Sequence, residues 1–271
     1  MILEFVFLVI SLSLALISSF TFWPVTQWLD FYKPLLMFVS TYLGLVFVTF
    51  FGLYGLSLLL INKKKEYTKV SWLSRVIFNN ALSYVDLHAH IRLKKVGLNK
   101  VPKNERFLLV CNHRSNFDSM ILSVVLKKQK LAFITKPSLF KIPIGGRHMR
   151  KLLYLGIDRQ DNLQSLAVMK KAEQYISDDL TSIGVFPEGT RQQDKVIGDF
   201  HEGVFNIAIQ TKCPVVVCSL EGTDKIKSNF PIHRSHVTLN FVETLYYDDY
   251  CDMNAKQLSD HVRTSMIQSL C

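Results

Sequence analysis

The chain has 271 residues, enough for one sizeable α/β domain preceded by a shorter segment. Its formal net charge of +10 favours anionic partners such as phospholipid headgroups, and no basic and aromatic pattern typical of nucleic-acid-binding modules accompanies it, so we expect no nucleic-acid partner. The five cysteines are odd in number and lack C-x-x-C spacing, which argues against a disulfide framework or a zinc ribbon and fits a reducing compartment.

Two uncharged apolar stretches occupy the N-terminal part of the chain, at residues 5–23 and 34–62. Each is long enough to cross the hydrocarbon core of a bilayer as an α-helix. Together they predict a membrane-embedded helical hairpin over residues 1–65. A cleaved signal peptide over residues 1–20 is the rival interpretation, but this segment contains Glu4 and lacks the basic start of such peptides. A hairpin that enters only one leaflet stays open as a second alternative.

The charges beside these stretches predict the orientation of the chain. Three lysines at residues 63–65 follow the second stretch, whereas the connection between the stretches carries only Asp30 and Lys33. Because basic residues collect on the cytoplasmic side of membrane proteins, this asymmetry places residues 66–271 in the cytoplasm. We therefore expect a membrane protein whose catalytic domain, residues 66–271, lies on the cytoplasmic side.

The rest of the chain alternates short apolar runs with helical patterns. Helices are expected at residues 66–92, 120–126, 163–180, 204–210 and 255–269, and strands at 107–111, 131–135, 183–186, 214–219 and 237–242. Strands that alternate with helices indicate a mostly parallel sheet flanked by helices, and hence an α/β fold. In such sheets, binding groups collect in the loops that follow the C-terminal ends of strands.

A candidate catalytic pair follows the first of these strands, where His113 and Asp118 lie five residues apart. A strand-to-helix turn between them would let the carboxylate hold one imidazole nitrogen while the other nitrogen accepts a proton. That arrangement is a general base directed at a hydroxyl group. Taken alone, the pattern also fits residues that cap a helix or form a turn, because Asp, Asn and Ser favour such positions.

A second candidate site follows the strand at 183–186 and reads Phe-Pro-Glu-Gly-Thr-Arg. Gly189 allows a tight backbone path, and Arg191 offers a planar guanidinium that suits phosphate oxygens. Glu188 could orient Arg191 or accept a hydrogen bond from a substrate hydroxyl. A surface turn with an ordinary ion pair is the alternative. A third block, from Lys136 to Arg159, is rich in cations that could hold an anionic headgroup, although a solvated basic surface would look the same.

These blocks, in this order, resemble the glycerolipid acyltransferase family, and specifically its 1-acylglycerol-3-phosphate acyltransferase branch. Asn112, His113 and Asp118 match the family motif N-H-x-x-x-x-D. Residues 186–191 match the motif F-P-E-G-T-R at all six positions. The two motifs stand about seventy residues apart, each behind an expected strand, and the resemblance covers roughly residues 80–225.

The resemblance implies an enzyme that moves a fatty acyl group from acyl-CoA or acyl-carrier protein to the free hydroxyl of 1-acylglycerol-3-phosphate, giving phosphatidic acid. His113 would be the base and Asp118 would orient it. The implied partners are a membrane lipid acceptor and an acyl thioester donor, with no metal and no cofactor. Transfer to another lysophospholipid or lipid acceptor is the alternative. The sequence assigns no oxyanion-hole donor; chemistry alone suggests a backbone N–H near the start of the helix after His113 as a candidate.

The same resemblance implies which residues bind substrate. It assigns this role to Glu188, Gly189, Thr190, Arg191, Lys136 and Arg159. Three positions differ from the residues that are frequent in the family. Ser138 occupies a position that is often acidic, Gln192 one that is often serine, and His201 one that is often lysine. These departures leave the headgroup and acyl-chain preferences open.

Overall fold

The computed structural model describes all residues of the chain except 1, 23–24, 64, 193–195 and 271. The chain separates into two compact units, Met1–Asn62 and Lys63–Cys271. This division lies three residues before the predicted boundary (62 against 65). Near the start of the second unit, Glu66 forms an ion pair with Lys171.

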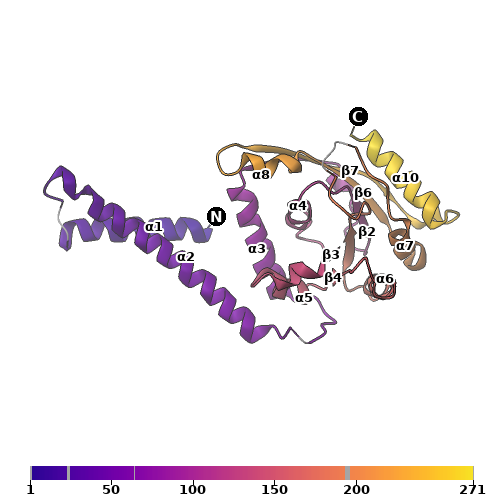
Figure 1. Cartoon of the computed structure of the whole chain (residues 1–271), viewed down its shortest axis with the longest axis horizontal. Helices are drawn as coiled ribbons and strands as arrows, with labels where there is room; N and C mark the ends of the chain where they lie inside the picture. The colour runs from indigo at the N-terminus through magenta and orange to yellow at the C-terminus, as the bar shows by residue number, and fades with distance from the viewer. Residues whose placement is uncertain (1, 23–24, 64, 193–195, 271) are drawn as a thin grey trace. The chain divides into compact units, whose positions relative to one another are not determined.

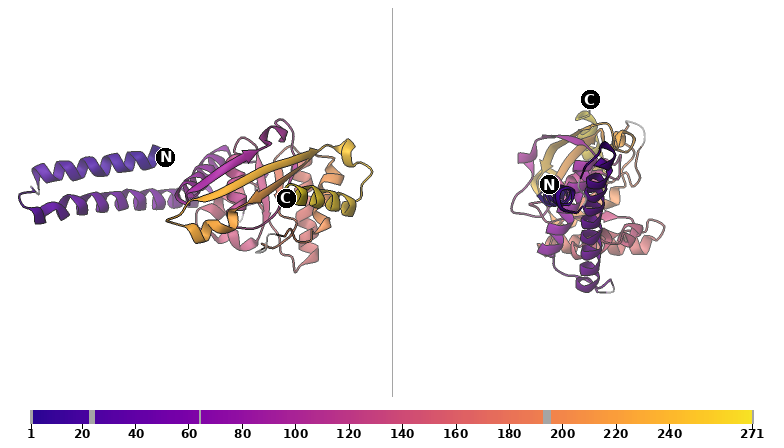
Figure 2. Two further views of the ribbon diagram at one scale, coloured as in Figure 1. Left: turned by 90° about the horizontal axis from the view of Figure 1, so that it is seen from above. Right: turned by 90° about the vertical axis from the view of Figure 1, so that its left-hand side faces the viewer.

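The N-terminal unit is a hairpin of two apolar helices, α1 (Ile2–Thr21) and α2 (Tyr32–Leu60), which Figure 2 shows side by side. Both helices are long and apolar enough to cross a membrane. The predicted hairpin is confirmed, and it supports association of the chain with a membrane. Small residues on one face of α1 allow close packing against α2; those that are buried are Ser11, Ala15 and Ser18.

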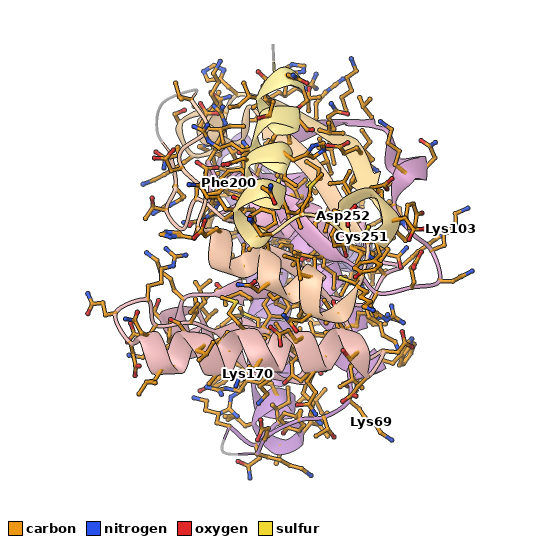
Figure 3. The ribbon with its side chains drawn as sticks, turned by 90° about the vertical axis from the view of Figure 1, so that its right-hand side faces the viewer. Lys69, Lys103, Lys170, Phe200, Cys251 and Asp252 are labelled. Carbon is orange, nitrogen blue, oxygen red and sulfur yellow. The ribbon has the colours of Figure 1, made fainter. Side chains whose placement is uncertain are left out.

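The second unit, which we call the catalytic unit, is a seven-stranded sheet between two layers of helices (Figure 1). Its strands are β1 (Ile91–Val96), β2 (Leu108–Cys111), β3 (Leu131–Thr135), β4 (Leu155–Gly156), β5 (Ser182–Val185), β6 (Val215–Glu221) and β7 (Ser235–Leu245). Its helices are α3 (Trp72–His88), α4 (Asp118–Val125), α5 (Gly145–Lys151), α6 (Asn162–Ser177), α7 (Asn206–Thr211), α8 (Ile226–Asn229), α9 (Tyr247–Tyr250) and α10 (Ala255–Gln268). Helices α6, α7 and α10 cover the face that Figure 3 shows, with Lys170 on α6 and Phe200 before α7.

The strand order is β1-β7-β6-β2-β5-β3-β4. Strands β2 to β6 all run in the same direction, and only β7 and its neighbour β1 run the opposite way. The predicted mostly parallel sheet is confirmed. The central strands β2 and β6 are buried on both faces, which explains why each reads in the sequence as an unbroken apolar run.

Two strands were not predicted. The first, β1, lies partly inside the helix expected over residues 66–92; the observed helix α3 ends at His88, and the left-handed backbone of His90 (φ 52°) turns the chain into the strand. Most side chains of β1 are exposed, so no apolar run marks it. The second, β4, has only two residues and is defined by its pairing with β3.

Because they are parallel, β2, β3, β4, β5 and β6 all finish at the same edge of the sheet. We call this edge the site edge. The register confirms the alignment, since Leu108 of β2 lies opposite Ile183 of β5 on one side and Val215 of β6 on the other. The loops that follow these strands, together with Asp118 at the start of α4, carry all the residues that the sequence assigns to the site.

Asp86 on α3 provides a test of the packing of the catalytic unit. Burial raises the pKa of Asp86 to about 6, and its Oδ1 atom has no hydrogen-bond partner among the described residues. Because folding raises this pKa, protonated Asp86 contributes fully to the stability of the folded state at pH values below its ordinary pKa of 3.8. That contribution is lost as the pH rises through about 6.

Asp86→Asn is therefore expected to stabilise the chain at neutral pH and to have little effect at about pH 4. Partial exposure limits the gain to about 1 kcal/mol, or about 2–4 °C in Tm. Thermal unfolding of both chains across this pH range measures the difference. The exposed Asp178→Asn serves as the control, and a Tm difference that does not grow with pH would show that the carboxylate of Asp86 is well solvated.

Candidate active site

His113 and Asp118 meet at the site edge, as the strand-to-helix turn predicts. The Nδ1 atom of His113 lies 2.8 Å from Oδ2 of Asp118. Strand β2 ends two residues before His113 and helix α4 begins at Asp118, so the turn between them brings the two side chains together. Asp118 is fully buried, whereas His113 is half-buried. With Nδ1 engaged, Nε2 of His113 is the nitrogen that can accept a proton.

The carboxylate of Asp118 is fixed by more than the imidazole. Its Oδ2 atom also accepts hydrogen bonds from the backbone N–H groups of Arg114 and Ser115, each at 2.7 Å. Three donors on one oxygen hold the carboxylate in one orientation. These two amides are consequently not free to serve as the candidate oxyanion donor near the start of α4.

Glu188 holds the backbone of His113. Its Oε1 atom accepts a hydrogen bond from the N–H of His113 at 2.8 Å, and Oε2 accepts one from Gly198 at 3.2 Å. The carbonyl oxygen of His113 is held as well, because it accepts a hydrogen bond from the N–H of Gln192 at 2.9 Å. Only 5% of Glu188 is exposed, and this burial raises its pKa. Both oxygens are engaged with backbone amides, which favours a positioning role over the predicted contact with the acceptor.

An aromatic stack supports the imidazole from one face. The ring of Phe186 lies against that of His113 with centroids 4.3 Å apart, and Phe133 stacks behind Phe186 at 5.7 Å. Gly184 makes room for this arrangement, because a Cβ atom there would lie 2.4 Å from the ring of Phe133. The stack limits rotation of the imidazole and gives the base an apolar wall.

Asn112 anchors the turn that carries the base, a role that the motif alone did not reveal. Its side-chain amide donates to the carbonyl oxygen of Leu220 at 3.0 Å and its Oδ1 accepts from the N–H of Leu220 at 2.7 Å. The buried side chain thereby continues the pairing of β2 with β6 beyond the last residue of β2. Every polar group of this amide that faces Leu220 is satisfied, as a buried polar side chain requires.

The turn after β5 and the segment after β4 meet at Gly189. This glycine has φ 72°, and a Cβ atom there would lie 2.8 Å from Nε2 of His201 and 3.2 Å from Nη1 of Arg159. The N–H of His201 donates to the carbonyl oxygen of Pro187 at 2.9 Å, which holds it beside this turn. The structure thus adds His201 to the candidate site, although the sequence marked it only as a departure from the family pattern.

The remaining predicted residues lie at the site edge with exposed side chains. Thr190 and Arg191 belong to the turn after β5, and Lys136 follows β3 directly. Within the described part of the chain, the side chains of these three residues make no hydrogen bond or ion pair. The cationic groups of Arg191 and Lys136 are available to an anionic ligand, and the substrate-binding role of all three residues stays a prediction.

The contacts of Glu188 lead to a test. Glu188→Gln is expected to lower kcat about tenfold with little change in KM for the acceptor, because the amide nitrogen of Gln cannot accept a hydrogen bond and one of the two backbone bonds is lost. Steady-state kinetics with varied acceptor measures both constants. Glu202→Gln, an exposed acidic residue, is the control. A raised KM with unchanged kcat would instead indicate that Glu188 contacts the acceptor.

The part of the chain that matches known proteins contains the same two motifs. The family model described as Acyltransferase matches residues 92–221. A chloroplastic 1-acyl-sn-glycerol-3-phosphate acyltransferase of Brassica napus is 34% identical over 131 residues, which are 48% of this chain and 37% of that protein. A probable 1-acyl-sn-glycerol-3-phosphate acyltransferase of Mycoplasma pneumoniae is 31% identical over 185 residues, 64% of this chain and 66% of that protein. The chain thus spans 37% and 66% of the length of these two relatives.

A solved structure shares the fold. The 1-acyl-sn-glycerophosphate (LPA) acyltransferase PlsC from Thermotoga maritima superimposes with a TM-score of 0.63, covering 83% of this chain and 91% of that chain at 21% sequence identity. The matched segment, residues 92–221, contains the pair His113–Asp118 and the carboxylate that positions it. This segment of the chain, residues 92–221, is an acyltransferase domain.

Proposed function

We propose that this chain is a 1-acylglycerol-3-phosphate O-acyltransferase, which transfers a fatty acyl group from an acyl thioester to the free hydroxyl of 1-acylglycerol-3-phosphate and yields phosphatidic acid. The observation that carries the proposal is the 2.8 Å contact between His113 Nδ1 and Asp118 Oδ2, which leaves Nε2 as a base for a hydroxyl group. The names of the two relatives support this choice of acceptor.

The geometry accounts for the reaction in two steps. As the acceptor oxygen attacks the thioester carbonyl carbon and forms the new C–O bond, its proton passes to Nε2 of His113. The tetrahedral intermediate then breaks its C–S bond, and the imidazolium of His113 returns the proton to the departing sulfur. Asp118 stabilises the imidazolium between these steps. The products are an ester and a free thiol, and no acyl group is attached to the protein.

Cations at the site edge suit the phosphate of the acceptor. Arg191, Lys136 and Arg159 follow three different parallel strands, so their charges converge on the same edge as His113. A guanidinium can bind two phosphate oxygens at once, which would place the acceptor in a defined orientation. The donor is expected to be acyl-CoA or acyl-carrier protein, and neither a metal nor a cofactor is part of the proposed chemistry.

The acceptor is proposed to reach the site from a membrane. Helices α1 and α2 are the proposed anchor, and the lysines at residues 63–65 favour a cytoplasmic position of the catalytic unit. A lipid acceptor held in the cytoplasmic leaflet would then not have to leave the bilayer entirely to react.

A product assay tests the proposal. The full chain, purified in detergent, is given lysophosphatidic acid with long-chain acyl-CoA or with acyl-carrier protein, and phosphatidic acid is measured. Formation of phosphatidic acid that requires both substrates is expected. Acylation of a different lysophospholipid alone would replace the proposed acceptor, and release of free fatty acid without any acceptor would identify a hydrolase instead.

A further inference from the structure

The connection between β6 and β7 exposes apolar side chains beside cations. We call residues 225–234 the α8 segment, because they contain helix α8. Within it, Phe230 is 54% exposed and Ile232 is 80% exposed. Large apolar side chains this exposed and this close together usually mark a surface that contacts another molecule or a membrane.

Basic residues predominate in this part of the chain. Exposed basic residues flank the apolar pair, and these are Lys225, Lys227 and Arg234. Acidic residues stand only before the segment, at Glu221 and Asp224, and the next one in the chain is Glu243. On the neighbouring strand β1, the exposed Arg92 lies opposite His236 of β7 and adds to the basic character.

The α8 segment lies at the site edge. Strand β6 runs parallel to β2, so the chain leaves β6 at the edge where the turn after β2 carries His113. Asn112 bonds directly to the backbone of Leu220, one residue before the end of β6. In Figure 1, α8 is at one end of the catalytic unit, and the layer of α6, α7 and α10 is on the opposite side.

We propose that the α8 segment is a second membrane contact, which inserts Phe230 and Ile232 into the interface of an anionic phospholipid bilayer while its cations meet lipid phosphates. Apolar side chains ringed by Lys and Arg match the two layers of such an interface, acyl chains below and anionic headgroups above. A protein partner would offer no comparable reason for this pattern. The choice of a bilayer rests in part on the proposed function, because the lipid acceptor must reach His113.

The consequence concerns substrate access. A contact at the α8 segment would hold the site edge against the headgroups, independently of the anchor formed by α1 and α2. The acceptor phosphate could then move from the leaflet to the site-edge cations over a short path.

A depth measurement on the full chain tests the contact without using catalysis. Ile232→Cys, in a chain whose Cys251 and Cys271 are changed to serine, is labelled with an environment-sensitive fluorophore and reconstituted into vesicles. Lipids that carry a nitroxide near the headgroup quench a label that enters the interface. The matched control is Leu98→Cys, which is 41% exposed and follows β1 at the opposite edge of the sheet.

Quenching at residue 232 but not at residue 98 is expected in vesicles that contain phosphatidylserine, with much less in pure phosphatidylcholine. Since each cation near an anionic surface contributes about fivefold to binding, reversing Lys225, Lys227 and Arg234 to glutamate is expected to abolish the quenching. Lys103→Glu, at the surface seen in Figure 3, should leave it unchanged.

Equal quenching at both labels, or none at residue 232, would overturn the proposal. So would protection of the label at residue 232 that depends on protein concentration and not on lipid, since this would identify a second copy of the chain as the partner. The readout involves no acyl transfer, so it can succeed or fail whatever the outcome of the product assay.

Discussion

Acyl transfer by the His113→Ala chain is expected to be about 10²- to 10⁴-fold slower than by the unchanged chain, the range that positioned general acid–base catalysis contributes. Alanine removes the nitrogen that, in the proposed mechanism, takes the hydroxyl proton and returns it to sulfur. The loss should appear in kcat, because His113 acts on the reacting atoms and the predicted acceptor-binding cations remain. Initial rates of phosphatidic acid formation over a range of acceptor concentrations measure it.

Two controls accompany this variant. His261→Ala on α10 removes another partly exposed histidine and should keep full activity. Flotation of the His113→Ala chain with vesicles should also be unchanged, because α1 and α2 are distant in sequence from the substitution and carry the apolar surface. Acyl transfer at the original rate would show that His113 is not the base, whatever the fate of Asp118.

Asp118→Asn is expected to be almost as damaging, with kcat reduced about 10²- to 10⁴-fold. The carboxylate supplies the negative charge that stabilises the imidazolium of His113. Asparagine can keep its oxygen towards His113, Arg114 and Ser115 only by placing its NH₂ group at the buried position of Oδ1, which has no partner among the described residues. The reverse orientation sets the NH₂ group against three donors. Both arrangements weaken the base.

The measurement again separates kcat from KM, and thermal unfolding checks that the chain is folded. Asp260→Asn, an exposed residue on α10, is the matched control. If Asp118 were only a turn residue, Asp118→Asn would lower Tm but leave kcat of the folded fraction close to the original value. Loss of kcat in a folded chain is the result that assigns Asp118 to the catalytic pair.

Much of the fold could be predicted because the signals are local. Strands β2, β5 and β6 are buried on both faces and β3 is largely apolar, so each appears as an apolar run whose ends the prediction placed within about two residues. The hairpin of α1 and α2 was equally clear from two long uncharged stretches. By contrast, β1 is exposed and rich in Lys and Arg, and it is a strand only because it pairs with β7.

The candidate catalytic pair could also be predicted from a local signal. Four residues of turn separate His113 from Asp118, and their side chains meet because a strand ends before His113 and a helix begins at Asp118. Residue types and spacing therefore determined the pair, together with the α/β class and the apolar hairpin.

Only the tertiary structure decided how the pair is held. Glu188 lies 75 residues from His113 in the sequence, and Leu220 lies 108 residues from Asn112. These contacts depend on the order and register of β5, β2 and β6, which no short pattern encodes. The same register makes Glu188 a buried acceptor for backbone amides and brings His201 to Gly189, while the predicted contact of Glu188 with substrate stays a prediction. Strand pairing is non-local, so a sequence motif can name such residues but cannot say which atoms they will meet.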